Sequence, residues 1–246
     1  MKNEKRYKKN IYAILVILLF WQIISSVLNK PIIPQPSIVL LYMIKSFFSI
    51  IFVHLLFSFG RIVFGVFISI VIGITLGIIM GYNNRYDDIL SPIIYFIYPI
   101  PKVALLPVVM LFFGLGELSK IIMIILIVVF QVIVAARDAV KNIPKETYYS
   151  LYTLGASKYD ILKNVLFPAA LPDILTSIRV STGTAVSVLF FIETYGTEYG
   201  MGYFIMDSWM RVNYVEMYSG IIIMGILGFL LFLMIDFFEK RFCVWK

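Results

Sequence analysis

The sequence predicts an all-α, polytopic membrane protein with about six transmembrane helices. Hydrophobic residues make up 61% of the 246 residues and charged residues only 14%, whereas soluble domains contain about 45–50% apolar and about 25% charged residues. The apolar residues form long uninterrupted runs, such as 62–82, instead of the short alternating segments of a transmembrane β-barrel. These observations argue against a soluble enzyme, a disordered chain and a secreted disulfide scaffold.

The distribution of basic residues predicts the topology. The formal net charge is +7, but lysines and arginines lie in short segments between apolar runs, as the positive-inside rule describes for cytoplasmic loops. They do not form one soluble face that could bind nucleic acid. Six spans place the basic segment 137–163 and both basic termini in the cytoplasm, whereas a further crossing would place that segment outside. We therefore expect a multi-pass protein of the bacterial inner (plasma) membrane with both termini in the cytoplasm.

The expected spans form one transmembrane domain over residues 1–246. They lie at about 11–28, 58–82, 89–113, 120–136, 174–194 and 214–238. The first resembles a signal peptide, but its apolar part is long and a small-x-small cleavage site is missing, so we expect an uncleaved span. The third is broken by Pro92, Pro99, Pro101 and Pro107. A membrane tolerates such prolines only where neighbouring helices or a water-lined cavity satisfy the freed carbonyl groups.

One apolar run is long enough for either one or two crossings. Residues 46–82 are interrupted only by Arg61, and the charge distribution favours a single crossing over 58–82. A short amphipathic helix over 37–45, near the outer surface, should precede it. Between the fifth and sixth spans, residues 196–213 predict an outer loop with a short helix inside it.

The sizeable polar segment contains a predicted pair of short helices within residues 144–170. Gly155 should end the first helix with a positive φ, as glycine commonly does at helix ends. Ser157, followed three residues later by Asp160, is a capping-box pattern that should begin the second helix. Both helices are amphipathic and too polar to enter the lipid.

The second helix of the pair has an apolar face and a predicted end. Pro168 and Pro172 should end it, because proline lacks a backbone N–H and cannot continue the hydrogen-bond ladder. The apolar residues expected on one face are Tyr159, Leu162, Val165 and Leu166. The residues alone leave two interpretations open: the pair docks a soluble partner, or it lies on the membrane surface as an amphipathic hairpin.

The helix pair resembles the EAA loop of ABC importer permeases, in which a glycine is followed by nine residues and then I-x-L-P. In this chain nine residues separate Gly155 from the sequence VLFP at 165–168. Other motifs resemble the nitrate/sulfonate/taurine branch of these permeases. They are PIIPQPS at 31–37, Arg61 with Gly65, SPIIYFIYPIPKVALLPVVMLFFGLGELSK at 91–120, ALPDILTSIR at 170–179, Glu193 and GMGY at 200–203. Their order and spacing extend the resemblance over about residues 30–240.

The resemblance implies a MetI-like ABC permease core and the membrane-spanning subunit of an ATP-driven importer. It implies two cytoplasmic ABC ATPase subunits, a solute-binding protein and a second copy of the permease, so that the chain acts as a homodimer in the lipid bilayer. The binding protein would meet the outer segments 31–45 and 196–212. The solutes of this branch are nitrate, sulfonates, taurine, bicarbonate and vitamin precursors. The sequence has no GxxxxGK[ST] phosphate-binding motif, so we expect ATP to be bound by the partner and the chain itself not to be an enzyme.

The resemblance assigns the ATPase-coupling loop to six residues: Glu146, Tyr149, Tyr152, Gly155, Ala156 and Pro168. One position departs from the pattern, because Tyr149 stands where the family places the glutamate that names the loop. Two docking accounts follow. Either Glu146 supplies the acidic contact to the ATPase, or the tyrosines at 148, 149 and 152 dock by packing.

Several other residues have both a structural and a functional interpretation. Gly73, Gly77 and Gly81 form overlapping GxxxG patterns that allow close helix packing, either within the chain or across a dimer. Glu193 and Lys102 are ionisable residues in or beside apolar segments and are therefore candidates for the translocation pathway. Arg61 and Arg179 are expected to extend their charges to the membrane surface.

The sequence argues against cofactor and metal chemistry and leaves two rival functions. One cysteine, Cys243, excludes an intrachain disulfide, and a single histidine, His54, argues against a histidine metal site. No cofactor is expected. An ion-coupled secondary transporter is the first alternative, but it needs ionisable residues at mid-membrane and often internal repeats. An intramembrane protease needs a Ser/His or Asp/Asp pair that the sequence does not suggest.

Overall fold

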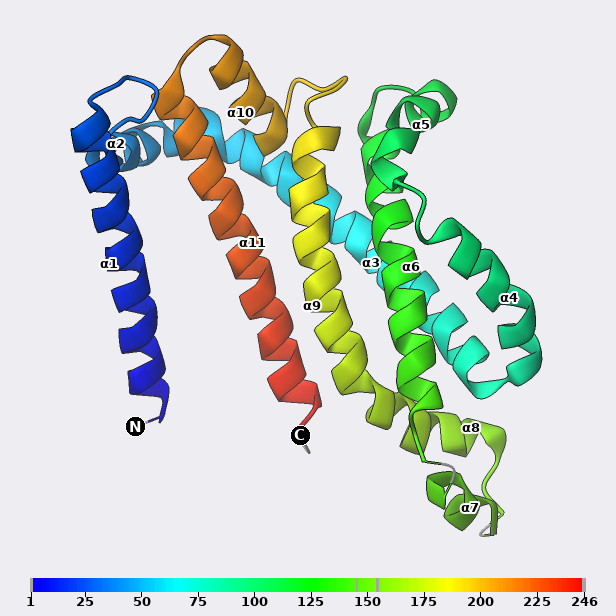
Figure 1. The fold of residues 1–246 in the computed structure, drawn as a ribbon. Coiled ribbons are helices and arrows are strands. Elements are labelled where there is room, and N and C mark those ends of the chain that lie inside the picture. The colour runs from blue at the N-terminus through cyan, green and yellow to red at the C-terminus, as the bar shows by residue number, and fades with distance from the viewer. Residues whose placement is uncertain (1, 145, 154, 245–246) are drawn as a thin grey trace.

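The computed structural model describes residues 2–144, 146–153 and 155–244 and is helical over most of them. Figure 1 shows long helices that run between two ends of an elongated bundle. Both chain termini and the short helices α7 (Glu146–Thr153) and α8 (Lys158–Ile161) lie at one end, which we call the basic end. The short helices α2 (Pro36–Ser46) and α10 (Met201–Met210) lie at the opposite end.

The long helices alternate in direction between the two ends (Figure 1). In chain order they are α1 (Lys2–Leu28), α3 (Phe52–Tyr82), the pair α4 (Asn84–Ile97) and α5 (Leu106–Phe113), α6 (Glu117–Lys141), α9 (Phe167–Ile192) and α11 (Tyr214–Phe242). Because α4 and α5 together return the chain to the opposite end, α3 and α6 run in the same direction.

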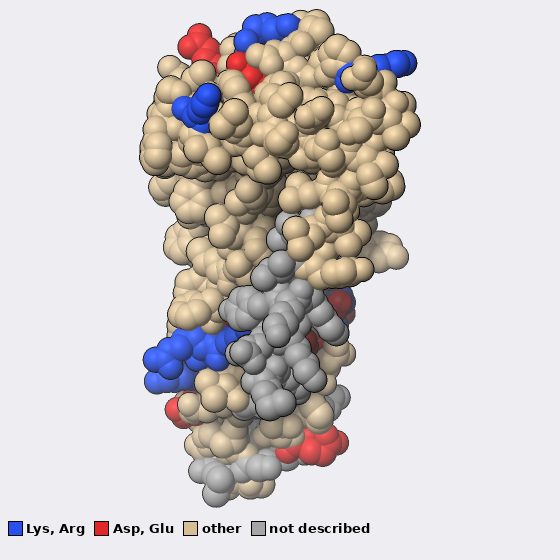
Figure 2. All heavy atoms as spheres, turned by 90° about the vertical axis from the view of Figure 1, so that its left-hand side faces the viewer, with Lys and Arg blue, Asp and Glu red and all other residues tan. Residues whose placement is uncertain are grey.

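Within the described residues, four continuous helical segments are long and apolar enough to cross a membrane: Pro36–Tyr82, Glu117–Lys141, Tyr159–Ile192 and Tyr214–Phe242. A fifth crossing results if α4 and α5, which are bent by 82° at a break, count as one span. These segments confirm the predicted all-α membrane fold. The crossing by α1, which would make six, remains a prediction. On the face in Figure 2, charged side chains gather near the top and in the lower part, and the described residues between them are mostly uncharged.

The second crossing is part of one unusually long helical segment. A π-helical turn, Phe47–Ile51, joins α2 to α3 without a break, so α3 begins at Phe52 and not near residue 58. A π turn is the usual way in which one extra residue is accommodated inside a helix. The predicted short helix is present as α2, which packs against α11 at the opposite end; its position near a membrane surface remains a prediction.

The proline-rich third segment is broken at Pro99 and Pro101, as predicted, but not at the other two prolines: Pro92 lies inside α4 and Pro107 lies in the first turn of α5. α4 ends at Ile97, and the chain resumes at Lys102 as a short 3₁₀ turn before α5. Pro99 and Pro101 lie in the gap, where a missing N–H donor and the restriction on the preceding residue both prevent a continuous helix. The break leaves backbone carbonyl groups without helical partners, and within a membrane such groups need partners from side chains.

The core of the bundle is built by the parallel packing of α3 on α6. Gly73, Gly77 and Gly81 of α3 lie directly against Val132, Ala136 and Val140 of α6, as placed Cβ atoms would stand only 2.6–2.7 Å from these side chains. Glycine removes this overlap and lets the two backbones approach closely. The structure thus places the GxxxG glycines in contacts within one chain.

We predict that Gly77→Ala destabilises the fold. Its Cβ would stand 2.6 Å from Ala136 Cβ and 2.6 Å from the Ile133 carbonyl oxygen, so the backbones must separate, at a cost of about 1–3 kcal/mol. Gly60→Ala on the same helix is the matched control, since nothing lies within 4 Å of its Cβ. The thermal midpoint of the detergent-solubilised protein should fall for Gly77→Ala alone. Equal midpoints would contradict this packing.

Candidate functional site

The helix pair at the basic end has the local geometry that the sequence predicts. Gly155 has φ +78°, a value that L-residues with a Cβ rarely adopt. Next to it, Ala156 N–H donates to Leu151 O at 3.0 Å, as in a Schellman helix end. The predicted positive φ and the end of the first helix are therefore confirmed. Leu151 and Ala156 are half-buried against the main core.

The capping box of the second helix is also confirmed. Asp160 N–H donates to Ser157 Oγ at 3.2 Å, and Ser157 N–H donates back to Asp160 Oδ2 at 3.0 Å. These reciprocal bonds satisfy two backbone donors that a helix start leaves unpaired. Gly155 and this box together fix the change of direction between α7 and α8 (Figure 1).

The prediction that Pro168 and Pro172 end the second helix is wrong. A π-helical turn, Leu162–Leu166, joins α8 directly to α9, with Pro168 in the first turn of α9 and Pro172 inside it. Pro168 has no backbone N–H and would interrupt the hydrogen bonds of a regular α-helix. The π turn just before it changes the hydrogen-bond pattern, so the helix continues through Pro168. The coupling loop is therefore continuous with a membrane-length helix, Tyr159–Ile192.

The π turn also changes which residues of α8 and of the turn itself face the bundle. Ile161 and Leu166 are fully buried in the core, whereas Tyr159 is 67% exposed and Leu162 36% exposed. The predicted single apolar face is thus divided between a buried anchor and an exposed apolar surface at the end of the molecule. The side chains of Tyr149 and Tyr152 lie outside the described part of the structure.

A buried ion cluster lies at the opposite end and centres on Arg61 of α3. Arg61 is 2% exposed and Glu193, at the end of α9, is 0% exposed. Arg61 Nη1 donates to Glu193 Oε1 at 2.7 Å, and the guanidinium also forms a bidentate pair with Glu117 of α6 at 2.5 and 2.6 Å. The prediction that Arg61 extends to the membrane surface is wrong, because two carboxylates hold its charge inside the bundle.

The same cluster fixes the loop after α9 and the start of α10. Glu193 Oε2 accepts from Gly202 N–H at 2.8 Å, and Ser58 Oγ donates to Glu193 and accepts from Met201 N–H at 2.7 Å. A Cβ at Gly200, where φ is +131°, would lie 2.5 Å from Glu193 Cδ. The GMGY motif therefore provides the close approach of α10 to the buried carboxylate.

Lys120 is a second buried cation at this end, and sequence reasoning did not single it out. It is 0% exposed, and its Nζ donates to the carbonyl oxygens of Leu115, Gly116 and Gly196 at 2.6, 3.2 and 2.9 Å. It thus ties the start of α6 to the loop after α9. A lysine inside the first turn of an apolar span is the signal that could have found it, because such a charge needs internal partners.

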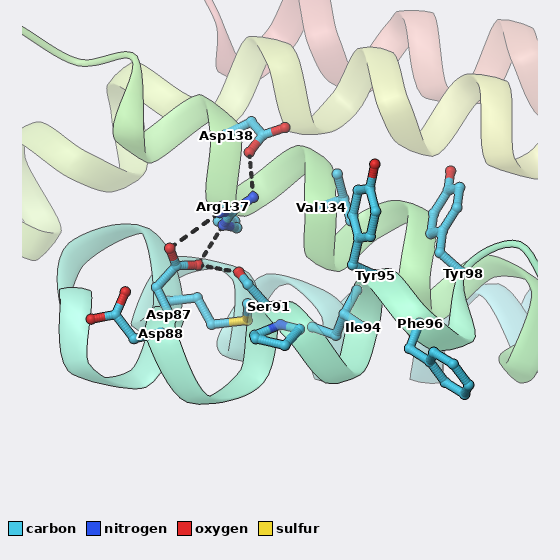
Figure 3. A pocket seen from close by; sticks show the side chains of 12 residues that line it. Asp87, Asp88, Ser91, Ile94, Tyr95, Phe96, Tyr98, Val134, Arg137 and Asp138 are labelled. Atoms are coloured by element: carbon cyan, nitrogen blue, oxygen red, sulfur yellow. Dashed lines mark hydrogen bonds and ion pairs between the residues drawn. The ribbon is translucent and has the colours of Figure 1, made fainter.

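An ion cluster at the basic end links α4 to α6. Figure 3 shows Asp87 and Ser91 of α4 facing Arg137 of α6. Arg137 Nε pairs with Asp87 Oδ1 at 2.5 Å, Ser91 Oγ donates to the same oxygen at 2.6 Å, and Lys141 Nζ pairs with Asp87 Oδ2. The residues border a hollow of about 950 Å³. Arg179 of α9 likewise pairs with Asp236 and Glu239 of α11, so it too is held by carboxylates.

The two predicted pathway residues lie in separate surroundings. Glu193 belongs to the buried Arg61 cluster, whereas Lys102 lies at the break between α4 and α5 and donates to the carbonyl oxygens of Ile97, at 3.1 Å, and Tyr98. Glu146 lies in the first turn of α7, and Ala156 and Pro168 lie before and after α8. The structure therefore places the described residues of the predicted coupling set at one end and does not bring Lys102 and Glu193 together.

Membrane-length helices, a broken span and a helix pair at the basic end define a polytopic transport protein. The family described as "Binding-protein-dependent transport system inner membrane component" matches residues 69–243. The chain belongs to this family and is a permease subunit of an ABC importer for small solutes. This family assignment is consistent with a transport subunit and not an enzyme.

Two relatives and one solved structure illustrate the similarity. The taurine transport system permease TauC of Escherichia coli is 33% identical and covers 78% of this chain and 70% of the relative. The formylaminopyrimidine transport permease ThiX of Halalkalibacterium halodurans is 28% identical, and the match covers 100% of this chain and 99% of the relative. The inward-facing MetNI methionine ABC transporter has a chain with TM-score 0.63, 19% identity and coverage of 75% of this chain and 94% of that one. It supports the MetI-like fold.

We predict that Arg61→Met strongly destabilises the protein. Glu193 would remain buried without its cation, and breaking a buried ion pair in this way costs about 3–5 kcal/mol. Arg211→Met is the matched control, because Arg211 is 51% exposed in its pairs with Asp207 and Glu216, and such surface pairs contribute about 0–1 kcal/mol. Thermal unfolding in detergent compares the two. Similar midpoints for both variants would contradict a stabilising role of the buried cluster.

Proposed function

We propose that α7 and α8 dock a cytoplasmic ABC ATPase, and that two copies of the chain together move a small anion delivered by a solute-binding protein. The observation that carries this proposal is that α8 and the following π turn present both buried and exposed apolar side chains. Ile161 and Leu166 are buried in the core, while Tyr159 and Leu162 are exposed at the tip of the molecule. A partner that binds Tyr159 and Leu162 would therefore act on a segment that Ile161 and Leu166 fix to the core of the bundle.

The geometry favours docking over a hairpin that lies on the membrane surface. α7 and α8 project beyond the ends of α6 and α9 (Figure 1), instead of spreading beside the bundle. The side chains of Ser157 and Asp160 form capping hydrogen bonds, which fix the start of the short helix α8. α8 then continues through the π turn into α9, which gives a direct mechanical path from the docking surface into the bundle.

The proposed orientation and partners follow from the basic end. It holds both termini, α7 and α8, together with Arg137, Lys141 and Lys163, which the positive-inside rule assigns to the cytoplasm. The opposite end then faces the binding protein with residues 31–45 and with α10. Two ATPase subunits and a second permease copy complete the proposed assembly.

A small anion is the proposed solute class. TauC, by its name, transports taurine, and it is the more identical of the two relatives. Lys102 places a cation at the break in the third segment, where an anion would be attracted. A formylaminopyrimidine, the solute named for ThiX, is the alternative and would not need this cation.

We predict that Gly155→Val prevents association with the ATPase. Gly155 has φ +78°, which a β-branched residue cannot adopt without strain, so the direction of α8 relative to α7 should change. Gly116→Val is the matched control, since φ is −74° there and nothing lies within 4 Å of its Cβ. The measurement is the amount of ATPase that copurifies with membrane-inserted permease. Normal copurification and transport by Gly155→Val would make the surface-lying hairpin the better account.

Tyr159→Ala should weaken ATPase binding by about 10-fold or more if Tyr159 is a central contact, because such interface residues cost over 1 kcal/mol when truncated. Tyr195→Ala, at the opposite end with a side chain 59% exposed, is the control and should bind normally. Glu146→Ala and Tyr149→Ala then separate the two docking accounts. A larger loss of ATPase binding in Glu146→Ala supports the acidic contact, and a larger loss in Tyr149→Ala supports packing of the tyrosines. If all of these variants bound the ATPase normally, docking by this loop would be ruled out.

The topology makes a simple prediction. A reporter enzyme that is active only outside the cytoplasm, fused after Lys246, should be inactive, whereas the same reporter inserted at Glu198 in the outer loop should be active. Activity of the fusion after Lys246 would mean an odd number of crossings for a cytoplasmic N-terminus.

A further inference from the structure

A small pocket lies where the broken third segment meets α6 and α9. Its volume is about 160 Å³, which is room for about five water molecules at about 30 Å³ each. It is lined by Tyr98, Lys102 and Val103 from the break, by Ile127, Phe130 and Gln131 of α6, and by Val188 of α9. These residues belong neither to the coupling loop nor to the Arg61 cluster. Broken helices at membrane depth are tolerated where they line a cavity.

Lys102 gives this pocket a positive charge that pairs with no carboxylate among the described residues. Its ammonium donates to Ile97 O at 3.1 Å and to Tyr98 O, and it stands 5.2 Å from the Tyr98 ring centroid and 5.4 Å from that of Phe130. An ammonium group has three N–H donors, and the third has no acceptor within the described residues. Neither carbonyls nor rings neutralise a charge, so an anion is the partner that the pocket lacks.

Gln131 adds an unfilled hydrogen-bond acceptor on the facing helix. Its side-chain Oε1 is buried and accepts no hydrogen bond within the part of the chain that the structure describes. Buried polar groups are normally paired. Of the five apolar and aromatic residues that line the pocket, only Tyr98 has a side-chain donor, its hydroxyl. A ligand that brings its own N–H or O–H would satisfy it.

We propose that this pocket binds the transported solute, and that the solute is a small anion that also carries an N–H or O–H donor, of the amino- or hydroxyalkanesulfonate type. The anionic group would take the free N–H of Lys102, and the donor would bond Gln131 Oε1. If the donor is an ammonium group, the faces of Tyr98 and Phe130 favour it further. The inference rests on the proposed transport of an anion, and it adds the site and the need for a donor.

The plain alternative is that Lys102 only completes the end of α4. Its two bonds to carbonyl groups of the last turn are what a basic residue commonly makes at a helix C-terminus. That role predicts no interaction with small anions. The two accounts therefore differ in whether an anion protects the pocket and whether the protection depends on Gln131.

Cysteine protection tests the site directly. Val103→Cys places a thiol at the pocket in a Cys243→Ser background, which removes the only native cysteine. The full chain, coexpressed with its ATPase and reconstituted in nanodiscs, is treated with the anionic reagent 2-sulfonatoethyl methanethiosulfonate. Taurine should slow labelling, and ethanesulfonate, which has the same sulfonate but no ammonium, should do so about 2- to 10-fold less well, the usual value of one hydrogen bond. Leu111→Cys, outside the pocket and 86% exposed, should not be protected.

Two variants assign the protection to the named groups. Gln131→Leu should remove the advantage of taurine over ethanesulfonate and leave the weaker protection by both. Lys102→Met should abolish protection by both and should remove the faster labelling by the anionic reagent relative to a cationic trimethylammonium analogue. Size-exclusion profiles and ATPase copurification check that each variant is folded and assembled.

The proposal is overturned if taurine and ethanesulfonate protect equally, if neither protects Val103→Cys, or if protection survives in Lys102→Met. In each of these cases ATPase copurification can still be intact, which would reject the pocket but keep ATPase docking. Loss of ATPase association in the parent protein would instead reject the transport assembly itself. A neutral pyrimidine that protects better than taurine would also overturn the anion class.

Discussion

The buried pair between Arg61 and Glu193 is the interaction on which the opposite end of the bundle depends. It joins residues 132 positions apart in the sequence, and through Glu117, Ser58 and Gly202 it connects α3, α6, α9 and α10. Two charges with almost no exposure would be very costly unpaired. The four elements must therefore meet in one arrangement. At Gly200 and Gly202 a Cβ atom would overlap the Glu193 side chain, so glycine allows this arrangement.

The close packing of α3 on α6 extends this constraint along the bundle. The glycine contacts run from Gly65 against Ile124 to Gly81 against Val140, that is, from near the Arg61 cluster to the Asp87 cluster at the basic end. α9 packs against both α6 and α3 and is continuous with α8. Movement of α8 is thus transmitted through packed helices rather than through flexible loops, which is the physical basis of the proposed coupling.

Local sequence signals predicted the features that depend on neighbours in the chain. Hydropathy and charge identified the membrane-length helices, Gly155 and the Ser157–Asp160 box identified the helix pair, and Pro99 and Pro101 identified the broken segment. The sequence did not predict features that depend on partners far away in the chain or on a local change in helical hydrogen bonding. Arg61 was expected at the surface because its carboxylate partners lie far away in sequence. The second helix of the pair was expected to end at Pro168 because no sequence signal predicted the π turn that precedes it.

The most direct test of this account measures both ends of the assembled transporter at once. Spin labels are placed at Asn164, exposed beside α8, and in a second preparation at Glu198, exposed in the outer loop, and the distance between the two permease copies is measured with and without a trapped ATP state. The account predicts that the distance at Asn164 falls and the distance at Glu198 rises together. A change at Asn164 with no change at Glu198 would contradict it, because the packed core would then not transmit the movement.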